Sequence, residues 1–160
     1  MDDIVKMQIP ALHHMVKRCC EIKARVVAQD ERESGLRRIL NYGHTIGHAL
    51  ESIGKYKKFI HGEAVGIGMV YEADLAHFLG LCSAKVVSRQ RALICRTGLP
   101  TKFPQMNFSD LWKAMLHDKK VVRGCVHCVL PKAIGKVTID PLDQRAIKSW
   151  FMQLGKYQAS

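Results

Sequence analysis

Two histidines, His44 and His48, stand four residues apart in a stretch of helical character. Residues at i and i+4 share one face of a helix, so the two imidazole rings are expected to point the same way. A third histidine, His61, follows the loop 52–60, which is long enough to turn the chain back on itself. Three ring nitrogens that converge on one small volume suit a divalent metal ion, with one histidine left for acid–base or phosphate chemistry.

Each histidine of this pair directly follows a glycine, Gly43 or Gly47. A histidine pair at helical spacing is more often an ordinary surface or core feature, but a glycine inside a helix costs about 1 kcal/mol relative to alanine. Such glycines indicate that another segment approaches the backbone closely. The spacing also occurs in zinc peptidases, but these enzymes need a glutamate directly after the first histidine as the base. Thr45 stands there instead, which excludes that activity.

The stretch 37–49, RRILNYGHTIGHA, closely resembles the signature of the 3-dehydroquinate synthase family. Further blocks occur in the order that the family has them, and together they extend the resemblance from about residue 19 nearly to the C-terminus. These blocks are residues 20–24, 26–33, 61–65, 98–100, 118–120 and 129–135.

The resemblance implies an enzyme of the shikimate pathway that converts 3-deoxy-D-arabino-heptulosonate 7-phosphate into 3-dehydroquinate and phosphate. Such an enzyme uses NAD and a metal, Zn²⁺ or another divalent ion such as Co²⁺, which polarises the oxygen being oxidised. It transiently oxidises a hydroxyl, eliminates phosphate, restores the hydroxyl and closes the ring by an aldol-type step. The full-length enzyme is expected to be a homodimer.

The resemblance also assigns roles to residues. His44 and His61 match the metal-binding histidines, and His48 matches a catalytic histidine at the phosphate end, where it could position the leaving group or assist proton transfer. Lys23 and Glu33 match a substrate-contacting lysine and an acidic active-site position. The remaining substrate- and phosphate-binding positions are Arg37 and Asn41, expected on the same helical stretch as His48, and the pair Lys119 and Lys120.

The expected domain organisation is a single metal- and substrate-binding domain over residues 1–160. Family members carry an NAD-binding α/β domain ahead of this region, but no strand–glycine loop–helix pattern precedes Lys23. That domain, and the glutamate that serves as third zinc ligand, are therefore expected to be absent, and the isolated chain is expected to be inactive. The alternatives are a non-catalytic remnant or scaffold domain, and a domain of a related sugar phosphate cyclase that makes inosose or valiolone skeletons.

Composition agrees with one globular domain. The chain has 160 residues, of which 48% are hydrophobic, enough for one core. Its net charge of +11 is spread along the sequence without interleaved aromatic residues or a nucleic-acid-binding motif, which favours a small phosphorylated partner over nucleic acid. There is no apolar run of membrane-spanning length and no signal-peptide pattern, so neither a membrane partner nor export is expected, and the expected location is cytoplasmic.

The six cysteines do not indicate a disulfide framework. The pair Cys125 and Cys128 has CxxC spacing, but a zinc knuckle or redox site would need a second pair or a thioredoxin-like context. The others are expected to be small buried hydrophobic residues in apolar helical stretches. They are Cys19, Cys20, Cys82 and Cys95.

The expected fold class is mainly α, a helical domain with one small β-hairpin, as in the C-terminal domain of the dehydroquinate synthase-like fold. The hairpin is predicted from strands 126–130 and 136–139. Two helices are predicted to begin at caps provided by Ser109 and by the Asp140-Pro141 pair, and another after Ser83. The predicted helices cover residues 11–29, 36–52, 61–78, 84–98, 110–116 and 141–154.

Overall fold

The computed structural model describes residues 1–33, 35–117, 121–122 and 124–158. By its internal contacts the chain divides into two compact units, Met1–Leu40 and Asn41–Ser160. The single domain expected over residues 1–160 stays a prediction.

The first unit consists mainly of one long helix. Helix α1 (Asp2–Val5) is a single turn, and α2 (Ile9–Gln29) begins with Pro10 in its first turn, where a missing N–H costs nothing. No residue of α2 is buried. The burial expected for Cys19 and Cys20 is therefore wrong, because the helix has apolar residues but no packed face within this unit.

The helix predicted over 36–52 is interrupted. A 3-10 helix, η1 (Leu36–Asn41), comes first, and α3 (His44–Ile53) begins only after Gly43. Gly43 has a φ of 81°, a left-handed conformation that glycine adopts without a steric penalty and that ends the helical path. The expectation that Arg37, Asn41 and His48 share one helix is therefore wrong.

In the second unit, α3 packs directly against α4 (His61–Phe78) through glycine. A Cβ on Gly68 would lie 1.9 Å from the carbonyl oxygen of Gly43, and a Cβ on Gly47 would lie 3.2 Å from that of Ala64. The close approach predicted from the glycines beside the histidines is confirmed. It brings the backbones of the two helices into contact and so fixes where their first residues lie.

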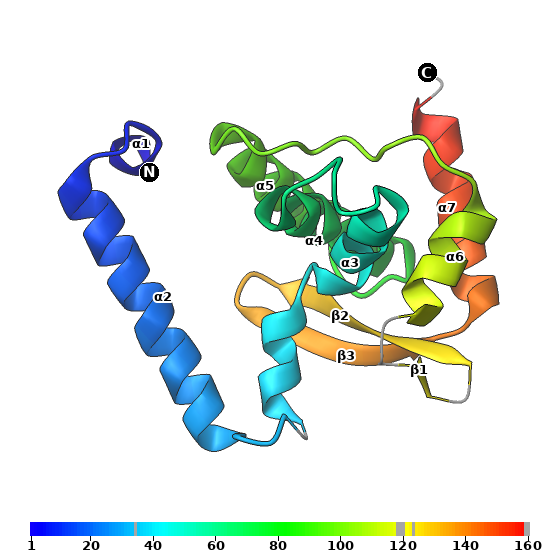
Figure 1. The fold of residues 1–160 in the computed structure, drawn as a ribbon, viewed down its shortest axis with the longest axis horizontal. Helices are drawn as coiled ribbons and strands as arrows, with labels where there is room; N and C mark the ends of the chain where they lie inside the picture. The colour runs from blue at the N-terminus through cyan, green and yellow to red at the C-terminus, as the bar shows by residue number, and fades with distance from the viewer. Residues whose placement is uncertain (34, 118–120, 123, 159–160) are drawn as a thin grey trace. The chain divides into compact units, whose positions relative to one another are not determined.

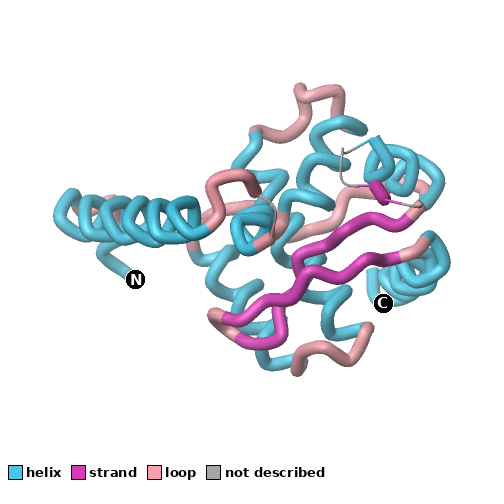
Figure 2. The backbone as a smooth tube through the Cα atoms, turned by 90° about the horizontal axis from the view of Figure 1, so that it is seen from below, coloured by secondary structure: helices cyan, strands magenta, loops and turns pink. Residues whose placement is uncertain are grey.

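An antiparallel sheet lies beneath these helices (Figures 1 and 2). Its strands are β1 (Val121–Val122), β2 (Cys125–Ala133) and β3 (Lys136–Leu142), in the order β1-β2-β3. Val129 pairs with Ile139, and a bulge lies between Pro131 and Ala133. The predicted hairpin is confirmed, although both strands are longer than expected. Figures 1 and 2 show α3 and α4 on one face of the sheet, which explains why the central part of β2 is buried.

Three further helices surround this centre, and two of their caps differ from expectation. Helix α5 (Ala84–Arg96) follows Ser83 as predicted, but α6 (Phe108–His117) is capped by Asn107, whose Oδ1 accepts a 2.8 Å hydrogen bond from the N–H of Asp110. Helix α7 (Gln144–Gln158) is capped by Asp143, whose Oδ1 accepts from the N–H of Ala146 at 2.8 Å. The caps expected from Ser109 and from Asp140-Pro141 are wrong: Ser109 lies inside α6, and Asp140 and Pro141 lie in β3.

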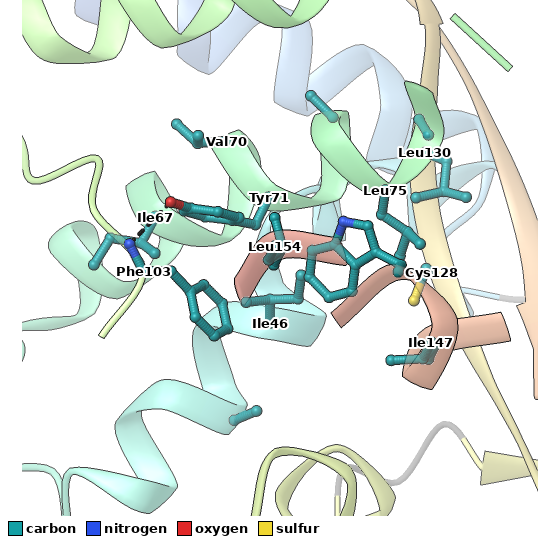
Figure 3. Close-up of a cluster of buried hydrophobic side chains, with 14 of the residues drawn as sticks. Ile46, Ile67, Val70, Tyr71, Leu75, Phe103, Cys128, Leu130, Ile147 and Leu154 are labelled. Atoms are coloured by element: carbon teal, nitrogen blue, oxygen red, sulfur yellow. Dashed lines mark hydrogen bonds between the residues drawn. The ribbon is translucent and has the colours of Figure 1, made fainter. Parts of the chain in front are cut away.

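The core of this unit joins α4 and α7 to the loop before α6 (Figure 3). Tyr71 and Phe103 meet edge to face with ring centroids 4.7 Å apart, and the Phe103 N–H donates to the Tyr71 hydroxyl at 2.9 Å. Trp150 is buried beside Phe103 and donates to Asp74 at 2.8 Å.

Cys82 is buried as expected. Cys95 on α5 is exposed, so the burial predicted for it is wrong. Within the described part of the chain, no helix combines the length and apolarity that crossing a bilayer requires.

Candidate metal centre

Three imidazole rings meet where α3 and α4 begin. The ring centroids of His44 and His48 lie 5.3 Å apart, those of His44 and His61 lie 5.4 Å apart, and those of His48 and His61 lie 6.0 Å apart. His44 is the first residue of α3, and His61 is the first residue of α4. The convergence predicted from the spacing of these histidines is therefore present, while their roles stay predictions.

The spacing of the rings fits a single small cation. With a Zn–N bond of about 2.1 Å and tetrahedral angles, the centres of two imidazole rings bound to one ion lie roughly 5 Å apart. The distances of 5.3 and 5.4 Å from the His44 ring are close to that value, and 6.0 Å requires only a small adjustment. The group whose ligand atoms already lie within 4.8 Å of one another consists of His48, Glu51 and His61 and does not include His44.

Acidic side chains offset the positive helix N-termini beside these rings. The Glu72 carboxylate is wholly buried and accepts hydrogen bonds from the backbone N–H groups of Gly43, Thr45 and Ile46, at 2.6, 3.1 and 3.2 Å. On α4, Glu63 accepts from the N–H of Ile60, the residue before the helix, at 3.2 Å. Both carboxylates satisfy free N–H groups and reduce the repulsion that a cation would meet at a helix N-terminus.

The two histidines predicted to bind metal each have their Nδ1 atom beside an oxygen. For His44 it is the carbonyl oxygen of Tyr42, at 3.1 Å, and for His61 it is Oε1 of Glu51, also at 3.1 Å. A carbonyl or carboxylate oxygen can only accept, so in the neutral ring the proton is on Nδ1. Nε2 then carries the lone pair that a metal ion requires.

Glu51 is a member of this cluster that sequence reasoning missed. Its side chain is only 11% exposed, whereas that of His61 is 59% exposed. Ligand atoms of His48, Glu51 and His61 lie within 4.8 Å of one another, a grouping that could itself hold a cation. A signal was available, because Glu51 follows His48 by three residues on the same helix and so shares its face.

Tyr42 anchors the turn before His44 to neighbouring helices. Its hydroxyl donates to Oε1 of Gln90 at 2.7 Å and lies 3.0 Å from the carbonyl oxygen of Met69. Burial, together with the negative charge of Glu72, raises the pKa of Tyr42 well above its ordinary value. The carbonyl oxygen that faces His44 therefore belongs to a firmly held residue.

The other predicted site residues belong to the first unit, to the start of the second unit, or to the part of the chain that is not described. Lys23, Glu33 and Arg37 belong to the first unit, where Asp30 accepts from the N–H of Arg37 at 2.9 Å. Asn41 opens the second unit at the end of η1. The roles of these four residues stay predictions. Lys119 and Lys120 fall outside the described residues.

The fold matches that of solved sugar phosphate cyclases. The chain matches 2-epi-5-epi-valiolone synthase of Streptomyces hygroscopicus, solved with NAD⁺ and Zn²⁺ bound, with a TM-score of 0.78 and 26% identity over 94% of this chain and 42% of that one. It also matches 2-deoxy-scyllo-inosose synthase, solved with carbaglucose-6-phosphate, NAD⁺ and Co²⁺, with a TM-score of 0.76 and 26% identity over 88% of this chain and 41% of that one.

Sequence comparison defines the family within that class. Residues 1–121 match the family model described as 3-dehydroquinate synthase C-terminal. The chain is 46% identical to the 3-dehydroquinate synthase of Synechocystis over 93% of its own length and 42% of that protein. It is 48% identical to that of Caldanaerobacter subterraneus over 87% of its length and 39% of that protein. The chain therefore belongs to the 3-dehydroquinate synthase family and spans about two fifths of the length of these relatives.

Proposed function

We propose that this chain is the metal- and phosphate-binding part of a 3-dehydroquinate synthase, which converts 3-deoxy-D-arabino-heptulosonate 7-phosphate into 3-dehydroquinate and phosphate. The observation that supports this most directly is the convergence of His44, His48 and His61 within 6.0 Å, at a spacing that suits one cation. Zn²⁺ or Co²⁺ and NAD are the proposed cofactors. A cytoplasmic location and a homodimeric full-length enzyme are parts of the same proposal.

His44 and His61 are the proposed metal ligands, because both hold Nδ1 against an oxygen, which places the lone pair of the neutral ring on Nε2. A bound divalent ion would polarise the substrate oxygen that is to be oxidised. His48 lies one turn further along α3 and is proposed to orient the phosphate or to move a proton at it. Arg37, Asn41, Lys119 and Lys120 are the proposed donors to the phosphate and carboxylate, with Lys23 and Glu33 as further contacts to the substrate.

The sequence comparisons favour this reaction over those of the related cyclases. Identity is 46–48% to the 3-dehydroquinate synthases but 26% to the valiolone and inosose synthases. The shared fold accounts for the second likeness without a shared substrate.

A chimera tests the proposal. The part of the Synechocystis enzyme that precedes its match would be fused to this chain, and phosphate release would be measured with NAD, Zn²⁺ and 3-deoxy-D-arabino-heptulosonate 7-phosphate. We expect turnover, and a loss of about 10²- to 10⁴-fold on His48→Ala. The exposed His117→Ala is the matched control and should retain full activity. A folded chimera that binds zinc and NAD but releases no phosphate would refute the proposal.

A further inference from the structure

Glu51 and His61 form a pair that links the end of α3 to the beginning of α4. Oε1 of Glu51 lies 3.1 Å from Nδ1 of His61. The glutamate side chain is 11% exposed and the histidine side chain 59% exposed, so the carboxylate lies behind the ring and the ring faces outward. A carboxylate is rarely buried unless a partner or a task compensates for its lost hydration.

We propose that Glu51 is a positioning residue that holds His61 in one tautomer and one ring orientation, with Nε2 presented to a divalent metal ion. This inference rests on the proposed function, because that function assigns His61 as a ligand. Since the carboxylate can only accept, it places the proton on Nδ1 and leaves the lone pair on Nε2. Carboxylates in this position also increase the basicity of the imidazole they contact.

The neighbouring histidine shows the same arrangement with a different acceptor. Nδ1 of His44 lies 3.1 Å from the carbonyl oxygen of Tyr42. Backbone carbonyls and carboxylates are the two acceptors that most often orient metal-binding histidines. Two rings held in the same way, with centroids 5.4 Å apart, are what a preformed pair of ligands requires.

Direct coordination by Glu51 is the competing interpretation, because it groups with His48 and His61 within 4.8 Å. Positioning is favoured because Oε1 already contacts Nδ1 of His61 and the carboxylate is largely enclosed. Coordination and positioning predict different results for the same variants, which makes them separable.

The first experiment needs no metal. The chain with ¹⁵N-labelled histidine would be studied by long-range ¹H–¹⁵N correlation at a pH where the ring is neutral, and His61 would be assigned with His61→Gln. We expect a protonated Nδ1 and an unprotonated Nε2. Glu51→Ala should convert the ring to a mixture of tautomers. A His61 ring with its proton on Nε2, or one that Glu51→Ala leaves unchanged, would overturn the inference.

The second experiment measures Co²⁺ affinity and the visible absorption spectrum of the bound ion. Removal of an orienting partner typically lowers metal affinity 10- to 100-fold, so we expect a loss of about that size for Glu51→Ala. Glu51→Gln should lose less, because the amide oxygen can still accept from Nδ1. Equal, large losses for both variants with an altered spectrum would identify Glu51 as a ligand and overturn the positioning role. An unchanged affinity in a folded Glu51→Ala chain would overturn it as well.

Glu63→Gln is the matched control. Glu63 lies two residues from His61 on the same helix, but its carboxylate contacts the N–H of Ile60 and not an imidazole. We expect it to leave the tautomer unchanged and, because only one charge at the helix start is lost, to lower the affinity by no more than about 5-fold. The tautomer measurement also separates this inference from the proposed function. If Glu51 fixes the tautomer of His61 but the chimera is inactive, the proposed function alone is refuted. If the chimera is active but Glu51→Ala leaves the tautomer of His61 unchanged, the positioning role alone is refuted.

Discussion

The carboxylate of Glu72 on α4 accepts a 2.6 Å hydrogen bond from the backbone N–H of Gly43, directly before the helix that carries His44. Its other oxygen accepts from Thr45 and Ile46, so one buried side chain satisfies three N–H groups at this helix start. The position of the His44 ring thus depends on a residue 29 positions beyond Gly43 in the chain. Glu72 acts as a cap supplied by a neighbouring helix.

Replacing Glu72 should therefore destabilise the fold strongly. In Glu72→Gln the amide keeps one acceptor oxygen but turns an NH₂ group toward N–H groups that need an acceptor. We expect the free energy of unfolding to fall by about 2–4 kcal/mol in urea denaturation. The control Glu63→Gln, which weakens a single exposed hydrogen bond, should cost less than about 1 kcal/mol. Similar small changes in both variants would contradict the role given to Glu72.

The contact between Gly68 and the Gly43 carbonyl gives a second stability prediction. A methyl group at position 68 would lie 1.9 Å from that oxygen, so Gly68→Ala must push α3 and α4 apart. We expect a loss of about 1–3 kcal/mol or more, measured by thermal or urea unfolding. Gly62→Ala is the control, because nothing lies within 4 Å of its added methyl group. It should be neutral or stabilise by up to about 1 kcal/mol, and a loss equal to that of Gly68→Ala would show that the close contact is not the cause.

Stability should also fall in alkaline solution. The pKa of Tyr42 is raised by burial above its ordinary value of 10.0, so the folded state keeps a proton that the unfolded chain releases. The stabilisation is complete below pH 10 and is lost as pH rises toward the folded-state pKa, by up to about 1.4 kcal/mol per pH unit. Burial, followed by the charge of Asp74, raises the pKa of Cys82 in the same direction, beginning above its ordinary value of 9.0.

Urea unfolding at intervals between pH 8 and 11 would measure this slope. Tyr42→Phe should be less stable at pH 8, because it loses the hydrogen bond to Gln90, yet its stability should fall less steeply above pH 10. Parallel curves for the two proteins would show that Tyr42 titrates alike in the folded and unfolded states.

Features that depend on local pattern could be predicted from the sequence. Helix α4 begins at His61 and ends at Phe78 as expected, because an apolar run is bounded by Glu63 in its first turn and by a glycine, Gly80, with a φ of 73° after its end. The convergence of the histidines follows from one helical spacing and one loop that returns the chain. Neither requires knowledge of a distant contact.

Features that depend on distant contacts could not. The break at Gly43 is stabilised by Glu72, and nothing near Gly43 in the sequence announces that partner. The Asp140-Pro141 pair has the appearance of a helix start, but Pro141 belongs to β3 and pairs with His127 of β2. This strand lies at the edge of the sheet, where a proline without an N–H is tolerated. Glu51 could have been found from its spacing to His48 on α3, but its contact with His61 across the loop could not.

Metal binding should stabilise the chain even before any activity is restored. At a free Zn²⁺ concentration 100 times the dissociation constant, an ion bound only to the folded state contributes about 2.7 kcal/mol, which corresponds to a rise in Tm of roughly 5–10 °C. The rise in Tm should disappear on addition of EDTA. It should also be absent in His61→Ala, because the His61 ring that this variant lacks lies beside both other imidazoles, at centroid distances of 5.4 and 6.0 Å. His117→Ala, an exposed histidine at the end of α6, should keep the full shift. A shift of equal size in His61→Ala and in the unaltered chain, measured by scanning calorimetry, would place the ion elsewhere and remove the metal centre from the proposed site.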